Sequence, residues 1–183
     1  MTIRKRISKD EYYMNIAREA SLRTSCFRAQ HGAVIVKDDQ IISTGYVGAH
    51  RKTKDCFERN SCLRRDLGIP SGQRYELCRS VHAEQNAIIN SARSGTSLLG
   101  AKMYLYSVKL EEDGAKNIID AYPCFICKKM IVNSGIIEVI SQQRNGKLKI
   151  YKIKDWVKDW QEKDLIDDME QYGIKTISSK RKK

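Results

Sequence analysis

Two short groups of residues with metal-ligand chemistry limit the folds open to this chain, because their side chains must meet although they lie far apart in sequence. The first group is His82-Ala83-Glu84, and the second is Pro123-Cys124-Phe125-Ile126-Cys127. One imidazole and two thiolates fill the three protein positions of a catalytic zinc site, which keeps its fourth position for water. The sequence therefore predicts a fold that brings both groups to one zinc ion.

Each group stands at the predicted start of a helix. Apolar residues at helical spacing run from Val81 to about Ala92, and again from Phe125 to Asn133. Cysteines three residues apart at a helix start can face one ion, and the positive end of the helix dipole favours thiolates. Pro123 suits the first helical position, where its missing N–H is harmless. The expected zinc ligands are therefore His82, Cys124 and Cys127.

Glu84 lies two residues beyond His82, so its carboxylate can face the same site without binding the metal. We expect Glu84 to take a proton from zinc-bound water and to deliver it to a ring nitrogen and a leaving amine. The combined pattern H-x-E…P-C-x-x-C is the signature of zinc-dependent nucleobase deaminases. Each half alone is weak, because a lone Cys-x-x-Cys is as often a structural zinc knuckle or a redox pair.

The sequence also resembles the cytidine and deoxycytidylate (dCMP) deaminase superfamily, and most closely its dCMP deaminases. The segments that carry the resemblance are Gln30–Val36, Ile42–Ala49, Ser80–Ile88 and Tyr122–Cys127, followed by Ser134-Gly135-Ile136. The resemblance implies a three-layer α/β/α sandwich with a central mixed sheet of about five strands, the same three zinc ligands, and Glu84 as proton shuttle. It further implies hydrolysis of dCMP to dUMP and ammonia by a homo-oligomer, with dCTP and dTTP as effectors.

The order of predicted elements favours a single α/β domain over residues 1–183, with its core at about 9–174. A helix at 9–23 precedes a hairpin of two short strands, and helices then alternate with strands up to a helix at 155–172. This order is typical of a sheet with helices on both faces. The strands are expected at 33–36, 41–44, 101–108, 136–140 and 148–153.

Three departures from the family pattern bear on the substrate. Val47 replaces an Asn that helps to hold the nucleotide, and a valine side chain can neither donate nor accept a hydrogen bond. His50 replaces the usual Pro of the same loop. The charged stretch 110–121 lengthens the connection between the two zinc-ligand groups. It is expected to form either an extended hairpin that reaches over the site or a neighbouring subunit, or a solvated loop.

Four further cysteines, Cys26, Cys56, Cys62 and Cys78, flank or lie within a polar, irregular insertion at 46–80. Four thiols suit a second, structural zinc, which would order a segment that has no core of its own. Some dCMP deaminases, the family that this sequence resembles, hold a non-catalytic zinc in this region. Cys26 and Cys56 match two of its ligands, and Cys62 and Cys78 would replace the two histidines expected there. The alternative is that one or more is a buried free thiol.

The net charge of +12 says little about partners, because nine of those charges lie in the ends at 1–9 and 175–183, where we expect solvated tails. No stretch approaches the ~18 consecutive apolar residues of a membrane span, and no apolar region follows the charged start. We therefore expect a cytoplasmic protein with no membrane partner. Between Arg28 and Arg79, basic residues outnumber acidic ones, which suits the binding of a nucleotide phosphate. The candidate phosphate ligands are Arg28, Arg51, Lys52, Arg74 and Arg79.

A mononucleotide deaminase is the leading functional prediction, and three alternatives stay open. A deaminase of a base in tRNA or single-stranded DNA could use the basic tails as electrostatic arms. Aromatic residues do not interleave with those clusters, however, which disfavours a nucleic-acid partner. A free nucleoside is another substrate. A catalytically silent zinc-binding module is disfavoured by Glu84, because structural zinc needs no unliganded acid at this spacing.

Overall fold

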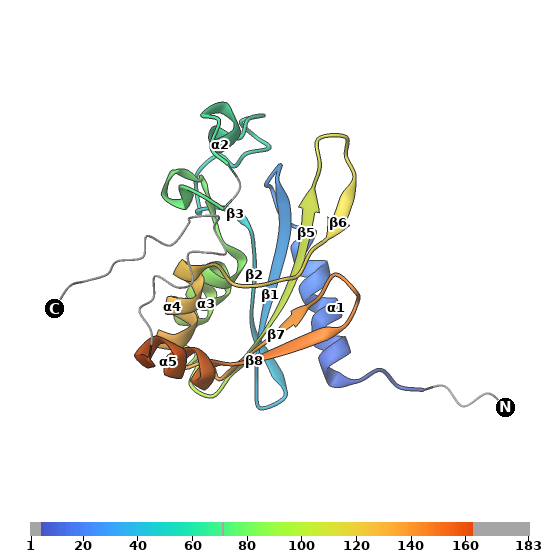
Figure 1. The fold of residues 1–183 in the computed structure, drawn as a ribbon, viewed down its shortest axis with the longest axis vertical. Coiled ribbons are helices and arrows are strands. Elements are labelled where there is room, and N and C mark those ends of the chain that lie inside the picture. Colours follow the sequence, from blue (N-terminus) through green and yellow to red (C-terminus); the bar gives the residue numbers. More distant parts are fainter. Residues whose placement is uncertain (1–4, 71, 163–183) are drawn as a thin grey trace.

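A mixed sheet of six strands organises the part of the chain that the computed structural model describes, residues 5–70 and 72–162 (Figure 1). Five strands lie in the order β2-β1-β5-β7-β8, and β6 pairs with β5 outside this path. Only the β5–β7 pair is parallel among the described strands. The strands are β1 (Ala29–Lys37), β2 (Gln40–Tyr46), β5 (Lys102–Leu110), β6 (Lys116–Ile118), β7 (Glu138–Gln142) and β8 (Leu148–Lys152).

The two central strands carry unbroken apolar runs because both faces of the sheet are covered. Ala33–Val36 of β1 and Met103–Tyr106 of β5 are buried throughout rather than at alternate positions. The predicted hairpin is confirmed: Lys37 pairs with Gln40 across a two-residue turn. Asp38 and Asp39 both adopt positive φ there, which suits a type I′ hairpin turn.

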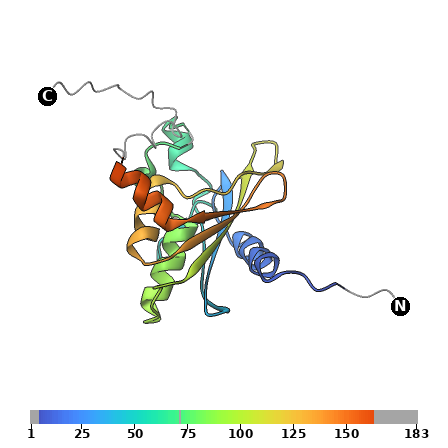
Figure 2. The same ribbon diagram turned by 60° about the horizontal axis from the view of Figure 1, so that its bottom comes forward.

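Helices cover the sheet on both faces, so the predicted three-layer sandwich is confirmed (Figures 1 and 2). One face packs against α1, which buries Tyr13, Met14 and Ala17. The helix begins with a capping box of Ser8 and Glu11. The other face packs against α3, α4 and α5. The helices are α1 (Lys9–Ser21), α3 (Ala83–Arg93), α4 (Phe125–Asn133) and α5 (Ile153–Glu162).

Two glycines of the sheet let the backbones of α1 and α3 pack directly against the strands. A Cβ on Gly32 would lie 2.0 Å from the Ala17 carbonyl oxygen of α1, and a Cβ on Gly45 would lie 2.2 Å from the Ala83 carbonyl oxygen of α3. Neither position has room for a side chain. The Ser43 hydroxyl also donates to the Ala87 carbonyl at 2.6 Å. These contacts fix the first turn of α3 against β2.

The insertion at 46–80 projects beyond one end of the sheet (Figure 1). Its base is closed by an antiparallel pair of short strands, β3 (Gly48–Ala49) and β4 (Ser80–Val81). Between them lie one turn of α-helix, α2 (Leu63–Asp66), and a 3₁₀ turn, η1 (Tyr75–Leu77). The predicted irregular segment is observed, but the β3–β4 pair was not predicted.

Other differences from the prediction lie at element ends. The seventh strand begins at Glu138 rather than 136, because Ile136 is buried in the connection that follows Gly135 before sheet pairing starts. The last helix begins at Ile153 and is described to Glu162. Its predicted continuation to 172 and the tail at 175–183 lie outside the described residues. Within the described ranges, no helix is long and apolar enough to cross a membrane.

Candidate active site

His82, Cys124 and Cys127 meet at the N-terminal ends of two helices. His82 is the N-cap of α3, and Cys124 is the N-cap of α4. The Nδ1 atom of His82 lies 3.3 Å from Cys124 Sγ and 3.4 Å from Cys127 Sγ. Zn–S bonds of about 2.3 Å and Zn–N bonds of about 2.0 Å in a tetrahedral site imply N···S separations of about 3.6 Å. The three side chains therefore fit a zinc ion, with one position left for water.

The pKa values of the two thiols of this site shift in opposite directions. The hydrogen bond with Cys127 lowers the pKa of Cys124, against the opposing effect of burial and with the help of His82. The same hydrogen bond, together with burial, raises the pKa of Cys127. Zinc binds cysteine as the thiolate, so both thiols must be deprotonated when a metal is bound, which makes metal affinity pH-dependent.

Glu84 stands in the first turn of α3 beside the three ligands. Its side chain is 8% exposed and lines a cavity. Burial is the main cause that raises the pKa of the Glu84 carboxyl, and the neighbouring His82 opposes this shift. A carboxyl with a raised pKa accepts and returns a proton near neutral pH more readily than an exposed glutamate does.

A cavity of about 1180 Å³ opens beside His82, Glu84 and Cys124. One wall comes from the insertion, through Arg64, Arg65 and Tyr75. Another part of the wall comes from the β5–β6 hairpin, which carries the acidic residues Glu111, Glu112 and Asp113. Of the two expectations for residues 110–121, the hairpin beside the site is thus the one observed. β6 itself was missing from the prediction, because its three residues carry no clear pattern.

His31 belongs to the cavity wall rather than only to the structure of β1. Its Nδ1 atom lies 2.8 Å from Ser107 Oγ, and burial lowers the pKa of His31 to about 4, so the ring is neutral at physiological pH. Val47 lies next to it, because the Val47 N–H donates to the His31 carbonyl. The Val47 side chain lines the cavity, so an apolar group and a neutral imidazole stand side by side there.

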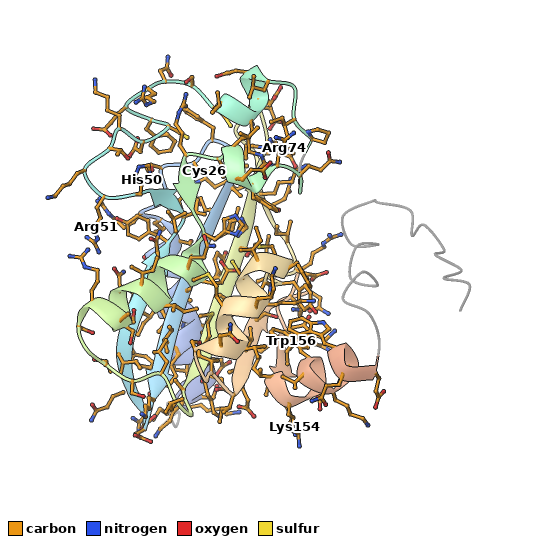
Figure 3. The ribbon with its side chains drawn as sticks, turned by 90° about the vertical axis from the view of Figure 1, so that its left-hand side faces the viewer. Cys26, His50, Arg51, Arg74, Lys154 and Trp156 are labelled. Atoms are coloured by element: carbon orange, nitrogen blue, oxygen red, sulfur yellow. The ribbon has the colours of Figure 1, made fainter. Side chains whose placement is uncertain are left out.

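Of the five basic residues predicted to bind phosphate, Arg28 is the one that lines this cavity. Arg51 donates to Asn90 Oδ1 at 2.7 Å on the outer side of the molecule (Figure 3). Arg74 pairs with the exposed Glu76. The cavity instead receives Arg64 and Arg65, which the sequence prediction missed. Their one available signal is that both follow Cys62 within one helical turn.

Cys26, Cys56, Cys62 and Cys78 all line the same cavity on the side of the insertion. Burial is the main cause that raises the pKa of Cys26 and of Cys56, and the neighbouring thiols add to the shift. The Arg28 N–H donates to Cys26 Sγ at 3.4 Å. Over the described residues, only His82, Cys124 and Cys127 have potential ligand atoms within 4.8 Å of one another as a group. The second zinc site stays a prediction.

The fold and the site together define a class, that of α/β/α proteins with a His-x-Glu and Cys-x-x-Cys zinc centre at two helix starts. Comparison with known proteins agrees. Residues 7–143 match the family described as the cytidine and deoxycytidylate deaminase zinc-binding region. Since this match covers most of the sequence, the chain belongs to the cytidine and deoxycytidylate deaminase family.

Several individual relatives are named deoxycytidylate deaminases. The chain is 35% identical to the deoxycytidylate deaminase of Mycobacterium phage D29 over 136 residues, which cover 72% of this chain and 91% of the phage protein. It is 33% identical to that of Saccharomyces cerevisiae over 138 residues, 75% of this chain but only 38% of the yeast protein. The dCMP deaminase of cyanophage S-TIM5, solved with dCMP and dUMP, shares the fold with a TM-score of 0.54 and 24% identity, over 76% of this chain and 85% of that one.

Proposed function

We propose that this protein is a zinc-dependent deaminase that hydrolyses dCMP to dUMP with release of ammonia. The observation that carries the proposal is the grouping of His82, Cys124 and Cys127 as potential metal ligands, with His82, Cys124 and the neighbouring Glu84 lining a cavity. The deoxycytidylate deaminase relatives support it, above all the phage D29 protein, which this chain matches over 91% of its length. The cyanophage deaminase of similar fold binds dCMP and dUMP.

The protein's own groups perform two tasks in this reaction. His82 and the two thiolates hold the metal, which when bound acts as a Lewis acid and lets water attack near neutral pH. Glu84 accepts a proton from the attacking water and passes it to N3 of the cytosine ring. It then carries the second proton to the amino group, which leaves as ammonia. Tyr75 contacts the His82 ring edge-on at 4.8 Å between centroids and so restrains its orientation.

The cavity walls favour a small nucleotide over a polynucleotide. Glu111, Glu112 and Asp113 of the β5–β6 hairpin place acidic side chains along the cavity. A nucleic-acid strand carries a negative charge at every phosphate, so a strand laid along this hairpin would meet more acidic groups than a single phosphate held at the insertion would. Regulation by dCTP and dTTP, assembly into a homo-oligomer and a cytoplasmic location stay predictions from the family resemblance and the sequence.

We also propose a second, structural zinc bound by Cys26, Cys56, Cys62 and Cys78. All four cysteines line one cavity, and the charges of Cys26, Cys62 and Cys78 each help to raise the pKa of Cys56. The Arg28 N–H donates to Cys26 Sγ, which partly offsets the effect of burial on the pKa of that thiol. Such an ion would order an insertion that buries few apolar side chains.

Glu84→Gln tests the deaminase proposal, because the amide keeps the shape of the carboxyl but cannot carry the proton. We expect this variant to bind zinc like the wild type and to lose at least about 10³-fold in kcat on dCMP. Activity is measured on dCMP, CMP, deoxycytidine, dCTP and single-stranded DNA, each with and without dCTP and dTTP as added effectors, and zinc by elemental analysis. Retention of most of the activity would exclude Glu84 as the shuttle, and turnover of the DNA alone would favour the polynucleotide alternative.

A further inference from the structure

Arg64 carries a buried positive charge that has no anionic partner. Its side chain is 6% exposed, and its Nη2 donates to the Pro70 carbonyl at 3.0 Å. Its Nε is buried without a hydrogen-bond partner. Across residues 5–70 and 72–162, no carboxylate forms an ion pair with it. A buried guanidinium in this state is costly unless an anion completes its environment.

The same side chain lies close to the zinc-ligand group. The Arg64 guanidinium carbon sits 4.9 Å from the centre of the Tyr75 ring, and that ring sits 4.8 Å from the centre of the His82 ring. The guanidinium carbon of Arg64 and the centre of the His82 ring are therefore at most about 9.7 Å apart. A pyrimidine mononucleotide spans a comparable length from the amino group of its base to its phosphate.

Other basic side chains of the cavity already have partners. Arg65 lies 3.8 Å from Glu112, and Lys109 lies 2.9 Å from Glu111. Arg28 donates from Nη1 to the Ile69 carbonyl at 3.2 Å. Arg64 is thus the cavity-lining arginine, among the described residues, whose buried N–H group still needs an acceptor.

We propose that Arg64 binds the 5′-phosphate of the substrate and so sets the preference for a nucleotide over a nucleoside. The proposal rests on the deaminase function above and adds the residue that reads the phosphate. A guanidinium presents N–H donors in a planar fork that matches a phosphate, and a charge-assisted pair of this kind is strong in a site shielded from water. The ring of Tyr75, which already packs on the guanidinium, would hold the fork in place.

If Arg64 binds the phosphate, the insertion as a whole takes part in substrate recognition. Arg64 stands two residues after Cys62 in the single turn α2, whose carbonyls and side chains connect it to the rest of the insertion. The segment at 46–80 would then supply the phosphate-binding arm of the site, while α3 and α4 supply the metal ligands and the proton carrier.

The test compares Arg64→Gln with two single-charge controls, Arg28→Gln and Arg51→Gln, on dCMP and on deoxycytidine. Arg28 shares the cavity, whereas Arg51 lies outside it. We expect Arg64→Gln to lower kcat/KM for dCMP by about 100-fold, in line with the loss of a buried charge-assisted hydrogen bond. Turnover of deoxycytidine should change by less than about twofold, because that substrate has no phosphate. Arg51→Gln should leave both substrates unchanged.

Equilibrium binding of dUMP and deoxyuridine, measured by calorimetry, separates this proposal from the deaminase function itself. If the wild type deaminates nothing, the proposed function fails, yet a selective loss of dUMP binding in Arg64→Gln would still support the phosphate role. An equal loss for both ligands would show a purely structural role and overturn it. So would a selective loss in Arg28→Gln alone, or an effect confined to the response to dCTP. Arg64→Lys, which keeps the charge, should recover part of the dUMP affinity if the insertion is folded.

Discussion

The sheet and the insertion each provide one side of the cavity, but they are held in place by different interactions. The sheet is fixed by continuous backbone pairing and by two buried apolar clusters. In and around the insertion, arginine side chains reach main-chain carbonyls instead. These bonds are Arg28 to Ile69, Arg64 to Pro70, Arg65 to Phe27 and Arg79 to Ser61.

This difference separates two roles within one site, catalysis and substrate recognition. The metal ligands and the proton carrier stand on helix ends that close packing fixes against the sheet, and such positions hold chemistry precisely aligned. The groups we assign to substrate recognition stand on an irregular segment, which can vary in sequence without disturbing the core. Perturbing the sheet should therefore lower global stability, whereas perturbing the insertion should change local order and substrate affinity.

Gly45→Ala should have the largest effect on stability. The added methyl group would lie 2.2 Å from the Ala83 carbonyl oxygen and 2.4 Å from the Ala87 nitrogen, so α3 must move as a unit. We expect a loss of about 3 kcal/mol in the free energy of unfolding, together with weaker zinc binding at His82. Urea unfolding measures the first, with Thr44→Ala at the exposed neighbouring position as control. Wild-type stability in Gly45→Ala would mean that α3 is not fixed by this contact.

The pH dependence of stability should report on His31 at the edge of the sheet core. Burial lowers its folded-state pKa to about 4, below the value of about 6.5 in an unfolded chain. Between these values the unfolded chain binds more protons, so acid favours unfolding. The contribution of neutral His31 to the free energy of unfolding is therefore fully present above about pH 6.5. About 3 kcal/mol of it is lost as the pH falls to 4.

Urea unfolding of the wild type and of His31→Gln at pH 7.5 and at pH 4.5 measures this contribution. The variant should lose less free energy of unfolding over this interval than the wild type does. Identical losses in the two proteins would assign the acid sensitivity to other groups.

Cys62→Ser should loosen the insertion and leave the core nearly intact. If the four-thiol zinc exists, metal analysis gives two zinc ions per wild-type chain and one in the variant. Trypsin should then cleave faster at the exposed Arg51, Lys52 and Arg59, while the urea midpoint of the core changes little. Limited proteolysis with mass spectrometry follows the cleavage. A single zinc in the wild type would rule out the structural site.

The contrast between the two regions also explains what the sequence could predict. The helix starts at His82 and Cys124 were predictable, because their signals lie within a few consecutive residues and the chemistry demands that they meet. Arg64 was not, because its burial depends on how an irregular segment folds back over Tyr75. The contact of Val47 with His31 was not predictable either, since it follows from sheet register and from the path of the chain after β2.

Ser8→Ala should have the smallest effect, because it removes a local interaction at the end of a helix that packing holds in place. Ser8 Oγ accepts from the Glu11 N–H at 3.2 Å, and Glu11 Oε2 accepts from the Ser8 N–H at 2.8 Å. Losing this cap should cost about 1 kcal/mol in urea unfolding, and Ser8→Asp, which can still accept the bond, should recover most of it.

Turnover of dCMP and tryptic cleavage of the insertion should both stay at wild-type levels in Ser8→Ala, because α1 covers the face of the sheet opposite α3 and α4 (Figure 2). A drop in kcat/KM without further loss of stability would contradict that separation. It would mean that α1 acts on the site through β1, whose Gly32 lies against Ala17 and whose His31 lines the cavity. The division of labour between sheet and insertion would then extend to a third element.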